Sequence, residues 1–351
     1  MAKEKVVIGL SGGVDSATAA YLLKKDGYEV IGVTIINWDG GAEACSDAAG
    51  IAEKLGISHY ILDFRKEFKN KVEDMFVREY LMGRTPNPCV MCNRDVKWGA
   101  VMAAKNDIGA DYVATGHYAN ILKYPKTGRL AVVVSDDEKK DQTYVLSMLT
   151  QEQLKCTLFP MGKYTKEETR KIAAEAGISV AEKPDSQEIC FIPDKDYVSF
   201  IENYTGEKAK EGNYVDFEGN VIGRHKGIIN YTIGQRKGLG VSFGKHMFVN
   251  AIDAEKNEVV LGSNESLFKN TVYAGNINFM ALDKIQEPIR AKAKIRYAHK
   301  RAECTIYPCE NGMAKFVFDE PQRAVTPGQA IAAYDGDYCL LGGIIEKGER
   351  V

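Results

Sequence analysis

Short apolar runs alternate with longer amphipathic stretches along the first half of the chain. The runs read as buried strands at residues 6–10, Glu29–Ile36, residues 59–63 and residues 112–115. The stretches between them read as helices at residues 15–25, Ala42–Leu55, residues 67–82 and residues 95–105. Strands that alternate with helices imply right-handed crossovers. The pattern therefore predicts an α/β fold with a doubly wound parallel sheet.

The pattern changes in the second half of the chain. Thr165 and Glu168 fit a capping box that opens one more helix. Helical periodicity then fades, and short strands separated by turns take over. The Asn-Gly pair at residues 311–312 and the Asp-Gly pair at residues 335–336 lie between β-like runs and predict hairpins. We therefore predict an α/β catalytic domain at residues 1–205, a small mostly-β module at residues 206–272 and a β-barrel-like domain at residues 273–351.

Composition narrows the class of protein. Hydrophobic residues make up 45% and charged residues 27% of the 351 residues, which excludes a disordered or fibrous chain. The formal charge of −2 gives no global sign of a nucleic-acid partner, so any contact with a polyanion must come from local patches. No apolar run approaches the ~18–20 residues of a membrane helix, and the first run is too short for a signal peptide. We therefore expect a cytoplasmic protein with no membrane partner, whose eight cysteines are reduced, catalytic or metal-bound.

A glycine pair follows the first apolar run, in Ser11-Gly12-Gly13-Val14-Asp15-Ser16. Glycines let the backbone approach an anion, and a helix start offers unpaired N–H groups and a positive dipole end. The segment lacks the Gly-Lys-Ser/Thr ending of a Walker A loop and the third glycine of a dinucleotide-binding fingerprint. Geometry alone leaves two interpretations, phosphate binding and a tight strand-to-helix connection. Asp15 suits an anion site if it holds a metal together with the phosphates.

Three cysteines are candidates for chemistry. Cys89 and Cys92 form a Cys-x-x-Cys pair in a proline-stiffened loop that leads into a helix, where a thiol beside Arg94 is expected to have a lowered pKa. Cys190 lies in an apolar segment, residues 189–192, that reads as a strand carrying it toward a sheet edge. A structural zinc would need a fourth ligand, which no spacing supplies. Two interpretations remain: a persulfide on Cys190 that Cys92 resolves to a disulfide, or three thiolates holding an iron–sulfur cluster with one iron open to sulfide.

The glycine loop is similar, almost letter for letter, to that of the ATP pyrophosphatases, which cleave ATP between the α and β phosphates. Further motifs follow in order at residues 37–38, 83–88, 92–93, 114–118, 140–142, 185–186, 189–192, 234–240, 296–297 and 326–329. Together they resemble the bacterial tRNA-specific 2-thiouridylases. The resemblance covers essentially the whole chain.

The resemblance implies a role for each matching position. It implies an ATP site at Gly9, Leu10, Ser11, Gly12, Gly13, Val14, Asp15, Ser16, Ile35 and Gly116. It implies that Cys92 is the nucleophile and that Cys190 receives persulfide sulfur. It implies contact with the target base at Asn87, Pro88 and Cys89, and other tRNA contacts at Lys140, Asp141, Gln142, Arg296 and Tyr297. The implied cofactor is ATP with Mg²⁺, and the implied partners are tRNA and a cysteine desulfurase or sulfur-relay protein.

Cys89 departs from the family pattern. Family members carry an aspartate there, and that carboxylate is credited with acid/base work that a thiol cannot simply replace. The substitution also completes a three-cysteine set, Cys89, Cys92 and Cys190, similar to that of the iron–sulfur-dependent tRNA thiolases. Both routes therefore stay open: a [4Fe–4S] cluster with these three ligands, and a persulfide on Cys190.

Positive charge gathers in two stretches of the β-rich half. No acidic residue lies between Glu218 and Asp253, and Arg290, Lys292, Lys294 and Arg296 alternate, so a strand would point all four to one face. Such patches suit phosphate contacts, or they keep an exposed strand edge from aggregating. Tyr231 and Tyr297 are candidates for stacking on a splayed base or for the core. We interpret His117 as structural.

Together these observations predict an ATP-dependent tRNA sulfurtransferase. ATP would adenylylate the C2 oxygen of a wobble uridine flipped out of its stack, and sulfur would displace AMP to leave 2-thiouridine. One rival is an amide-forming synthetase that uses ammonia and does not need the cysteines. The other is a non-catalytic cysteine–metal RNA-binding module, which binds tRNA without consuming ATP.

Overall fold

A five-stranded parallel sheet forms the centre of the N-terminal part of the molecule. The computed structural model describes residues 3–40, 42–178, 189–240, 244 and 246–350. The sheet has the order β3-β2-β1-β4-β7, and every neighbouring pair is parallel. Its strands are β1 (Lys5–Gly9), β2 (Glu29–Ile36), β3 (Ser58–Asp63), β4 (Tyr112–Ala114) and β7 (Thr157–Leu158). The order runs outward from β1 in both directions, which confirms the doubly wound sheet.

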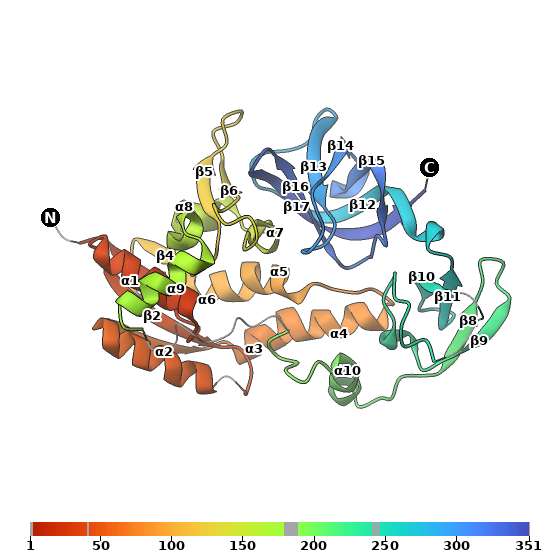
Figure 1. Ribbon diagram of the computed structural model, residues 1–351, viewed down its shortest axis with the longest axis horizontal. Coiled ribbons are helices and arrows are strands. Elements are labelled where there is room, and N and C mark those ends of the chain that lie inside the picture. The colour runs from red at the N-terminus through yellow and green to blue at the C-terminus, as the bar shows by residue number, and fades with distance from the viewer. Residues whose placement is uncertain (1–2, 41, 179–188, 241–243, 245, 351) are drawn as a thin grey trace.

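Helices cover both faces of this sheet (Figure 1). Val6 and Ile8 of β1 pack among α1 (Val14–Lys25), α2 (Ala42–Leu55) and α9 (Lys166–Glu175), whereas Val7 faces α6 (Trp98–Ile108). Alternate residues of a strand point to opposite faces, so this buried strand is apolar throughout. The capping box at the start of α9 is confirmed, because Thr165 and Glu168 exchange both of its hydrogen bonds.

Two helical segments depart from the α pattern. The long helix expected at residues 67–82 consists of α3 (Arg65–Phe68), a π turn η1 (Lys69–Glu73) and α4 (Asp74–Leu81). The helix expected from residue 95 begins seven residues earlier, as α5 (Pro88–Cys92), followed by a π turn η2 (Asn93–Lys97) that leads into α6. Asn87 caps α5 by accepting a hydrogen bond from the Cys89 N–H at 3.2 Å, and proline suits the first helical position. The Cys-x-x-Cys pair therefore lies in a helix and not in the preceding loop.

Short elements complete this part of the chain. They are the hairpin β5 (Asn120–Lys123) and β6 (Leu130–Val133), α7 (Thr143–Leu146), α8 (Gln151–Lys155), the 3₁₀ turn η3 (Pro160–Lys163) and α10 (Tyr197–Thr205). The strand expected at residues 189–192 is absent, since Cys190 lies in a turn closed by a hydrogen bond from the Ile192 N–H to the Ile189 carbonyl at 3.0 Å. The Asp185-Ser186 motif lies outside the described residues. None of the described helices is both long and apolar enough to cross a membrane.

A small four-stranded sheet follows, with its own apolar core. Its order is β10-β11-β8-β9, and only the β11–β8 pair is parallel. The core gathers Tyr214, Tyr231, Val249 and Leu261. Tyr231 is therefore a core residue and not an exposed stacking platform. The elements are β8 (Gly212–Val215), β9 (Val221–His225), η4 (Ile228–Asn230), β10 (Phe248–Asp253) and β11 (Glu258–Gly262).

The C-terminal strands close into a barrel. The sheet order β12-β15-β14-β13-β16-β17 is closed by pairing of β12 with β17, which confirms the barrel. Both expected hairpins are present, one between β14 and β15 and one between β16 and β17. The elements are η5 (Glu265–Leu267), β12 (Phe268–Phe279), β13 (Ile289–Lys294), β14 (Ala302–Pro308), η6 (Glu310–Gly312), β15 (Ala314–Arg323), β16 (Ala330–Asp335) and β17 (Tyr338–Glu349).

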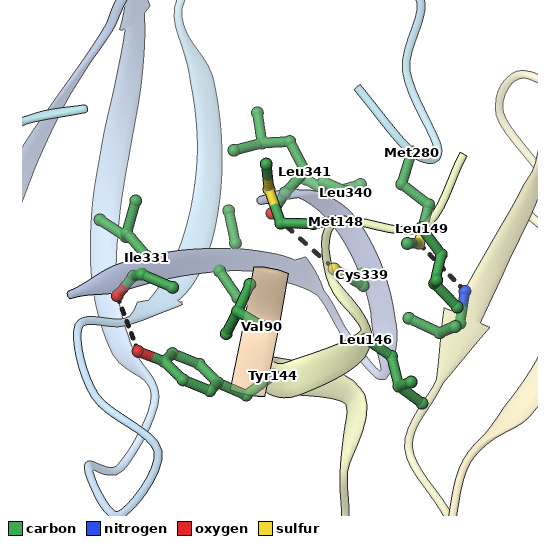
Figure 2. Close-up of a cluster of buried hydrophobic side chains, with 14 of the residues drawn as sticks. Val90, Tyr144, Leu146, Met148, Leu149, Met280, Ile331, Cys339, Leu340 and Leu341 are labelled. Carbon is green, nitrogen blue, oxygen red and sulfur yellow. Dashed lines mark hydrogen bonds between the residues drawn. The ribbon is translucent and has the colours of Figure 1, made fainter. Parts of the chain in front are cut away.

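The barrel and the parallel-sheet domain share one core. The β5–β6 hairpin extends the barrel sheet through the pair Val133 and Tyr338, which the sequence did not indicate. Figure 2 shows Val90 of α5, Leu146 of α7 and Leu340 and Leu341 of β17 in one cluster of buried side chains. Apolar contact across this junction fixes the Cys-x-x-Cys helix against the barrel.

Candidate functional site

The glycine loop between β1 and α1 is built to receive an anion. Gly12 has a φ of +72°, and a Cβ there would lie 2.8 Å from the Cβ of Asp47, so the turn requires glycine. Gly13 is the N-cap of the 12-residue helix α1 and brings no side chain that caps its first N–H groups. Ser16 donates a hydrogen bond to the Gly13 carbonyl at 3.0 Å, and its Oγ lies 3.2 Å from the Oγ of Ser11. Uncapped N–H groups, two hydroxyls and a positive helix end fit a phosphate group.

The neighbouring strand ends converge on this loop. Gly116 follows β4, and a Cβ there would lie 2.6 Å from the Ser16 nitrogen and 2.7 Å from the Asp15 carbonyl carbon. Only glycine permits so close an approach. Leu10 is buried, and its N–H donates to the Val33 carbonyl of β2 at 2.8 Å, which brings the half-buried Ile35 to the same sheet edge. The structure thus brings the ATP-site candidates together at the carboxyl end of the sheet, where ligands of doubly wound folds bind.

Asn37 adds an unsatisfied acceptor at the same edge, directly after β2. Its side-chain oxygen is buried and has no hydrogen-bond partner within the described part of the chain. A buried acceptor is costly unless a donor reaches it. The amino group of a purine base is a donor that suits it, so this atom fits a bound nucleotide.

Asp15 is held by two side chains that are distant in the sequence. Lys166, the first residue of α9, places its Nζ 2.7 and 2.8 Å from the two Asp15 carboxylate oxygens. The Tyr118 hydroxyl donates to Asp15 Oδ1 at 2.8 Å, and its oxygen lies 2.9 Å from the Thr169 hydroxyl. Asp15 is thus in an ion pair in this structure, and a lysine lies beside a loop whose own sequence contains none.

The three candidate cysteines lie in mutual electrostatic range. Burial raises the pKa of the Cys92 thiol to about 12, nearby Lys97 lowers it, and thiolate charge on Cys190 or Cys89 raises it. Dense packing likewise raises the pKa of Cys190, although its side chain reaches the surface, and Cys89 is exposed. The lowered pKa expected for the Cys-x-x-Cys pair is therefore wrong for Cys92, because desolvation outweighs the helix end.

Aromatic packing explains why Cys190 meets this helix. Phe191, the next residue, makes edge-to-face contacts with Phe68, Phe76 and Phe200, with ring centroids 5.2–5.4 Å apart. Cys92 belongs to the same buried cluster. Among the residues that the structure describes, no group of three or more Cys, His, Asp or Glu side chains is arranged to hold a metal ion.

Two of the segments expected to contact tRNA meet at Tyr297, which lies within electrostatic range of Cys89. The Tyr297 hydroxyl lies 3.4 Å from the Asp141 carbonyl, and burial followed by the charges of Asp141 and Cys89 raises the pKa of Tyr297. Gln142 exchanges two hydrogen bonds with Tyr118, which carries this loop toward the Asp15 side of the sheet. Tyr297 is 44% exposed and is therefore available for stacking.

Three family descriptions match consecutive stretches of the chain. They are "tRNA methyl transferase HUP domain" at residues 4–194, "tRNA methyl transferase PRC-barrel domain" at residues 198–263 and "Aminomethyltransferase beta-barrel domain" at residues 269–345. The tRNA-specific 2-thiouridylase MnmA of Lachnoclostridium phytofermentans is 51% identical over 98% of this chain and all of that protein. The same-named proteins of Clostridioides difficile and Acetivibrio thermocellus are 51% and 50% identical, over 98% or more of each chain. The chain belongs to this 2-thiouridylase family.

Solved structures offer only a distant likeness. The NMN synthetase of Francisella tularensis is 15% identical, with a TM-score of 0.35 over 59% of this chain and 79% of that one. So distant a likeness has no bearing on the function of this 2-thiouridylase-family chain.

The alternating cations of β13 lie on one face of the strand, as the pattern predicted, but acidic side chains of the neighbouring strands pair with two of them. Arg290 donates to Asp319 at 2.7 Å, and Lys292 lies 3.3 Å from Glu303, so acidic residues of β14 and β15 neutralise both. Arg296, just beyond β13, donates to the Ala324 carbonyl and the Thr326 hydroxyl, and its burial lowers its pKa. Lys294, at the inner end of the row, lies 5.5 Å from the Tyr297 ring centroid.

The contacts of His117 indicate a structural role. Burial lowers its pKa to about 3, so the imidazole is neutral at physiological pH. Its Nδ1 lies 2.7 Å from the Thr115 hydroxyl, and its ring packs on Trp98 and Phe159. By contrast, sequence reasoning missed Lys166, and it included Tyr118 in the 114–118 motif without connecting it with Asp15, because no local signal links either residue with that carboxylate.

Proposed function

We propose that this chain is a tRNA sulfurtransferase that converts a wobble uridine of tRNA to 2-thiouridine, with AMP and pyrophosphate as co-products. The observation that carries the proposal is the convergence of Cys89, Cys92 and Cys190 with the 140–142 and 296–297 segments, in a chain that also has the phosphate loop. The relatives that match the whole chain are named tRNA-specific 2-thiouridylases. The ATP site and the thiols together supply activation and sulfur.

The phosphate loop would bind ATP. Bound ATP with Mg²⁺ supplies an adenylyl group for the uridine C2 oxygen, which turns a poor leaving group into AMP. Gly9, Leu10, Ser11, Gly12, Gly13, Val14 and Ser16 would line the phosphates and Ile35, Gly116 and Asn37 the rest of the nucleotide. Asp15 would hold the magnesium ion in exchange for part of its bonding to Lys166.

The exposed Cys190 would receive the sulfur. A cysteine desulfurase or a sulfur-relay protein would transfer a sulfane sulfur to its thiol, which leaves Cys190 as a persulfide. The terminal sulfur attacks C2 of the activated uridine, and the Cys92 sulfur then attacks Cys190 Sγ. A Cys92–Cys190 disulfide forms, the S–S electron pair stays with the sulfur on C2, and AMP leaves; a thiol reductant restores both thiols.

The raised pKa of Cys92 suits a nucleophile that stays protonated until it attacks. At neutral pH its thiol is protonated, so its proton must leave as it attacks, and the nearby Lys97 cation favours that loss. A protonated Cys92 thiol would attack the persulfide only slowly, because the thiolate is the nucleophile. Asn87, Pro88 and Cys89, at the start of α5, would contact the flipped base, and Lys140, Asp141, Gln142, Arg296 and Tyr297 the surrounding tRNA.

Serine variants of the cysteines test the proposal. Thiolated tRNA is measured on a mercury gel with ATP, Mg²⁺, a persulfide donor and a thiol reductant. Cys190→Ser and Cys92→Ser are expected to abolish thiolation, whereas Cys156→Ser and Cys309→Ser, half-buried cysteines outside the cluster, retain it. Full thiolation by Cys190→Ser would refute the proposal. Cysteine-independent ATP use with ammonia would indicate an amide-forming synthetase, and tRNA binding without ATP use a non-catalytic module.

The cluster route needs a separate measurement. Cys89, Cys92 and Cys190 are near one another but not in a metal-holding arrangement among the described residues, so we derive no step through an iron–sulfur cluster. We expect protein purified without oxygen to contain no iron or acid-labile sulfide, in wild type and in Cys89→Ser alike. Near-stoichiometric iron that is lost in Cys89→Ser would replace the persulfide route with a cluster held by these three thiols.

A further inference from the structure

Lys97 is a half-buried cation without a carboxylate partner in the described part of the chain. Asp95, the nearest acidic residue in the sequence, is bound to Arg94 instead, through two hydrogen bonds of 2.7 and 2.9 Å. A cation that is partly removed from water is costly unless an opposite charge accompanies it. An anionic group of a bound substrate would therefore be stabilised beside Lys97.

The π turn η2 brings Lys97 to the same face as Cys92. The Trp98 N–H donates to the Asn93 carbonyl five residues earlier, so a turn here holds more residues than an α-helical turn. Residues five apart, such as Cys92 and Lys97, then lie nearly above one another, as residues four apart do in an α-helix. The charge of Lys97 accordingly acts on the thiols of Cys92 and Cys190.

The residue after Lys97 reaches the edge of the sheet that carries the phosphate loop. Trp98 is fully buried, and its ring centroid lies 5.7 Å from that of His117. His117 directly follows Gly116, which lies against the Ser16 nitrogen of the loop. The charge of Lys97 also acts on His117. Lys97 is therefore in electrostatic range both of the thiols and of the end of β4 that supports the loop.

The proposed reaction needs a phosphate group between these two places. In the first step the uridine C2 oxygen bonds to the α-phosphorus of ATP, the bond to the β-phosphate oxygen breaks, pyrophosphate leaves with the electron pair, and the N3 proton of the base passes to water. In the second step sulfur bonds to C2, the C2–O bond breaks, and AMP leaves with the electron pair. The α-phosphate thus joins nucleotide and base, so it lies between the phosphate loop and the thiols.

We propose that Lys97 is a catalytic residue of both steps, and that its ammonium contacts a non-bridging oxygen of the α-phosphate. There it stabilises the negative charge that builds up on this group during adenylyl transfer and again as AMP leaves. The inference rests on the proposed function, because a phosphate lies beside the thiols only if the base is adenylylated there.

Single-turnover release of pyrophosphate from ATP, Mg²⁺ and tRNA, without a sulfur donor, isolates the first step. Lys97→Met keeps the length of the side chain and removes its charge, and Lys97→Gln is a second neutral replacement. For both, the rate is expected to fall about 10²- to 10³-fold, the usual cost of losing one preorganised donor. Lys97→Arg keeps the charge and should react at least about tenfold faster than Lys97→Met. Circular dichroism checks that each variant is folded.

Lys105→Met is the matched control. Lys105 is a half-buried lysine of α6, directly after η2, and its charge acts on the thiol of Cys156, outside the cluster. This variant should release pyrophosphate at the wild-type rate. Wild-type release in both neutral Lys97 variants, with only thiolation slowed, would limit Lys97 to the thiols and overturn the inference, as would an equal loss in Lys105→Met. A failure of the proposed function is distinguishable, because wild type would then release no tRNA-dependent pyrophosphate.

Discussion

Cys92 and Cys190 differ in exposure, although burial raises the pKa of both thiols. Cys92 lies among Phe68, Phe76 and Phe191, so its charged form is poorly solvated, whereas Cys190 lies on an exposed turn. Asp15 shows the complementary effect, because Lys166 and Tyr118 stabilise its charge beside the phosphate loop. At both centres a neighbour distant in the sequence sets the state of the reactive group.

The thiol environments predict an order of reactivity. With iodoacetamide at pH 8, Cys92 should be alkylated at least about 100-fold more slowly than an unperturbed thiol, because only the thiolate reacts. Its pKa of about 12 lies above the ordinary value, so the labelling rate should still be rising beyond pH 10. Peptide mass spectrometry after timed quenching gives each rate, with Cys89 and Cys190 as internal comparisons. Labelling of Cys92 before Cys190 would contradict the assignment.

At the scale of elements, the phosphate loop depends both on its own sequence and on packing against the end of a distant strand. The glycine loop is short because β1 ends at Gly9 and α1 begins at Val14, and the residue after β4 must be small enough to lie against it. The sheet order places these two ends side by side, since β1 pairs directly with β4. The phosphate loop is therefore supported by an element about a hundred residues away.

Gly116→Ala tests this support. The added methyl group would press on the Ser16 nitrogen at 2.6 Å and displace the loop. Overpacking of about 1–3 kcal/mol corresponds to a loss of ATP affinity of about 5- to 150-fold. Isothermal titration with a non-hydrolysable ATP analogue measures it. Gly99→Ala is the control: this glycine lies in α6 with nothing within 4 Å of the added Cβ, so affinity should not change. Equal affinity in both variants would show that the loop does not depend on this contact.

At the scale of the whole molecule, three apparent domains are organised around unequal cores. The largest core runs from Val7 and Trp98 of the parallel-sheet domain to Phe316 and Ile331 of the barrel, whereas the small sheet packs on a separate core around Tyr214. The Tyr144 hydroxyl, which donates to the Ala330 carbonyl at 2.8 Å, crosses the larger junction (Figure 2). The barrel is thus part of the structural unit that carries Cys92.

The shared core predicts that the two outer domains unfold together. Native-state hydrogen exchange in increasing urea should give amides of β4 and β16 the same opening free energy and the same urea dependence. Amides of β8 and β11, in the small sheet with its own core, should open at lower urea. If the barrel amides exchanged in a separate, earlier transition, the barrel and the parallel-sheet domain would unfold independently despite their shared core.

The amino-acid sequence by itself determined the local elements and the chemical repertoire. Residues Glu29–Ile36 and Ala42–Leu55 form the expected strand and helix, the Thr165 capping box is present, and the glycine loop lies where the residues at 11–16 required it. These features depend on contacts within a few residues, such as periodic burial, capping hydrogen bonds and glycine's positive φ. The Cys-x-x-Cys spacing and the family motifs together pointed to the three thiols, Cys89 being a departure from the family pattern.

Only the tertiary structure decided how these parts act on one another. It moved the start of α5 to Pro88, put Cys190 in a turn, buried Cys92, paired Arg290 with Asp319 and brought Lys166 to Asp15. Each outcome depends on burial or on partners far away in the chain. Propensity and spacing carry no information on either, because desolvation and ion pairing are set by which surfaces the whole fold brings together.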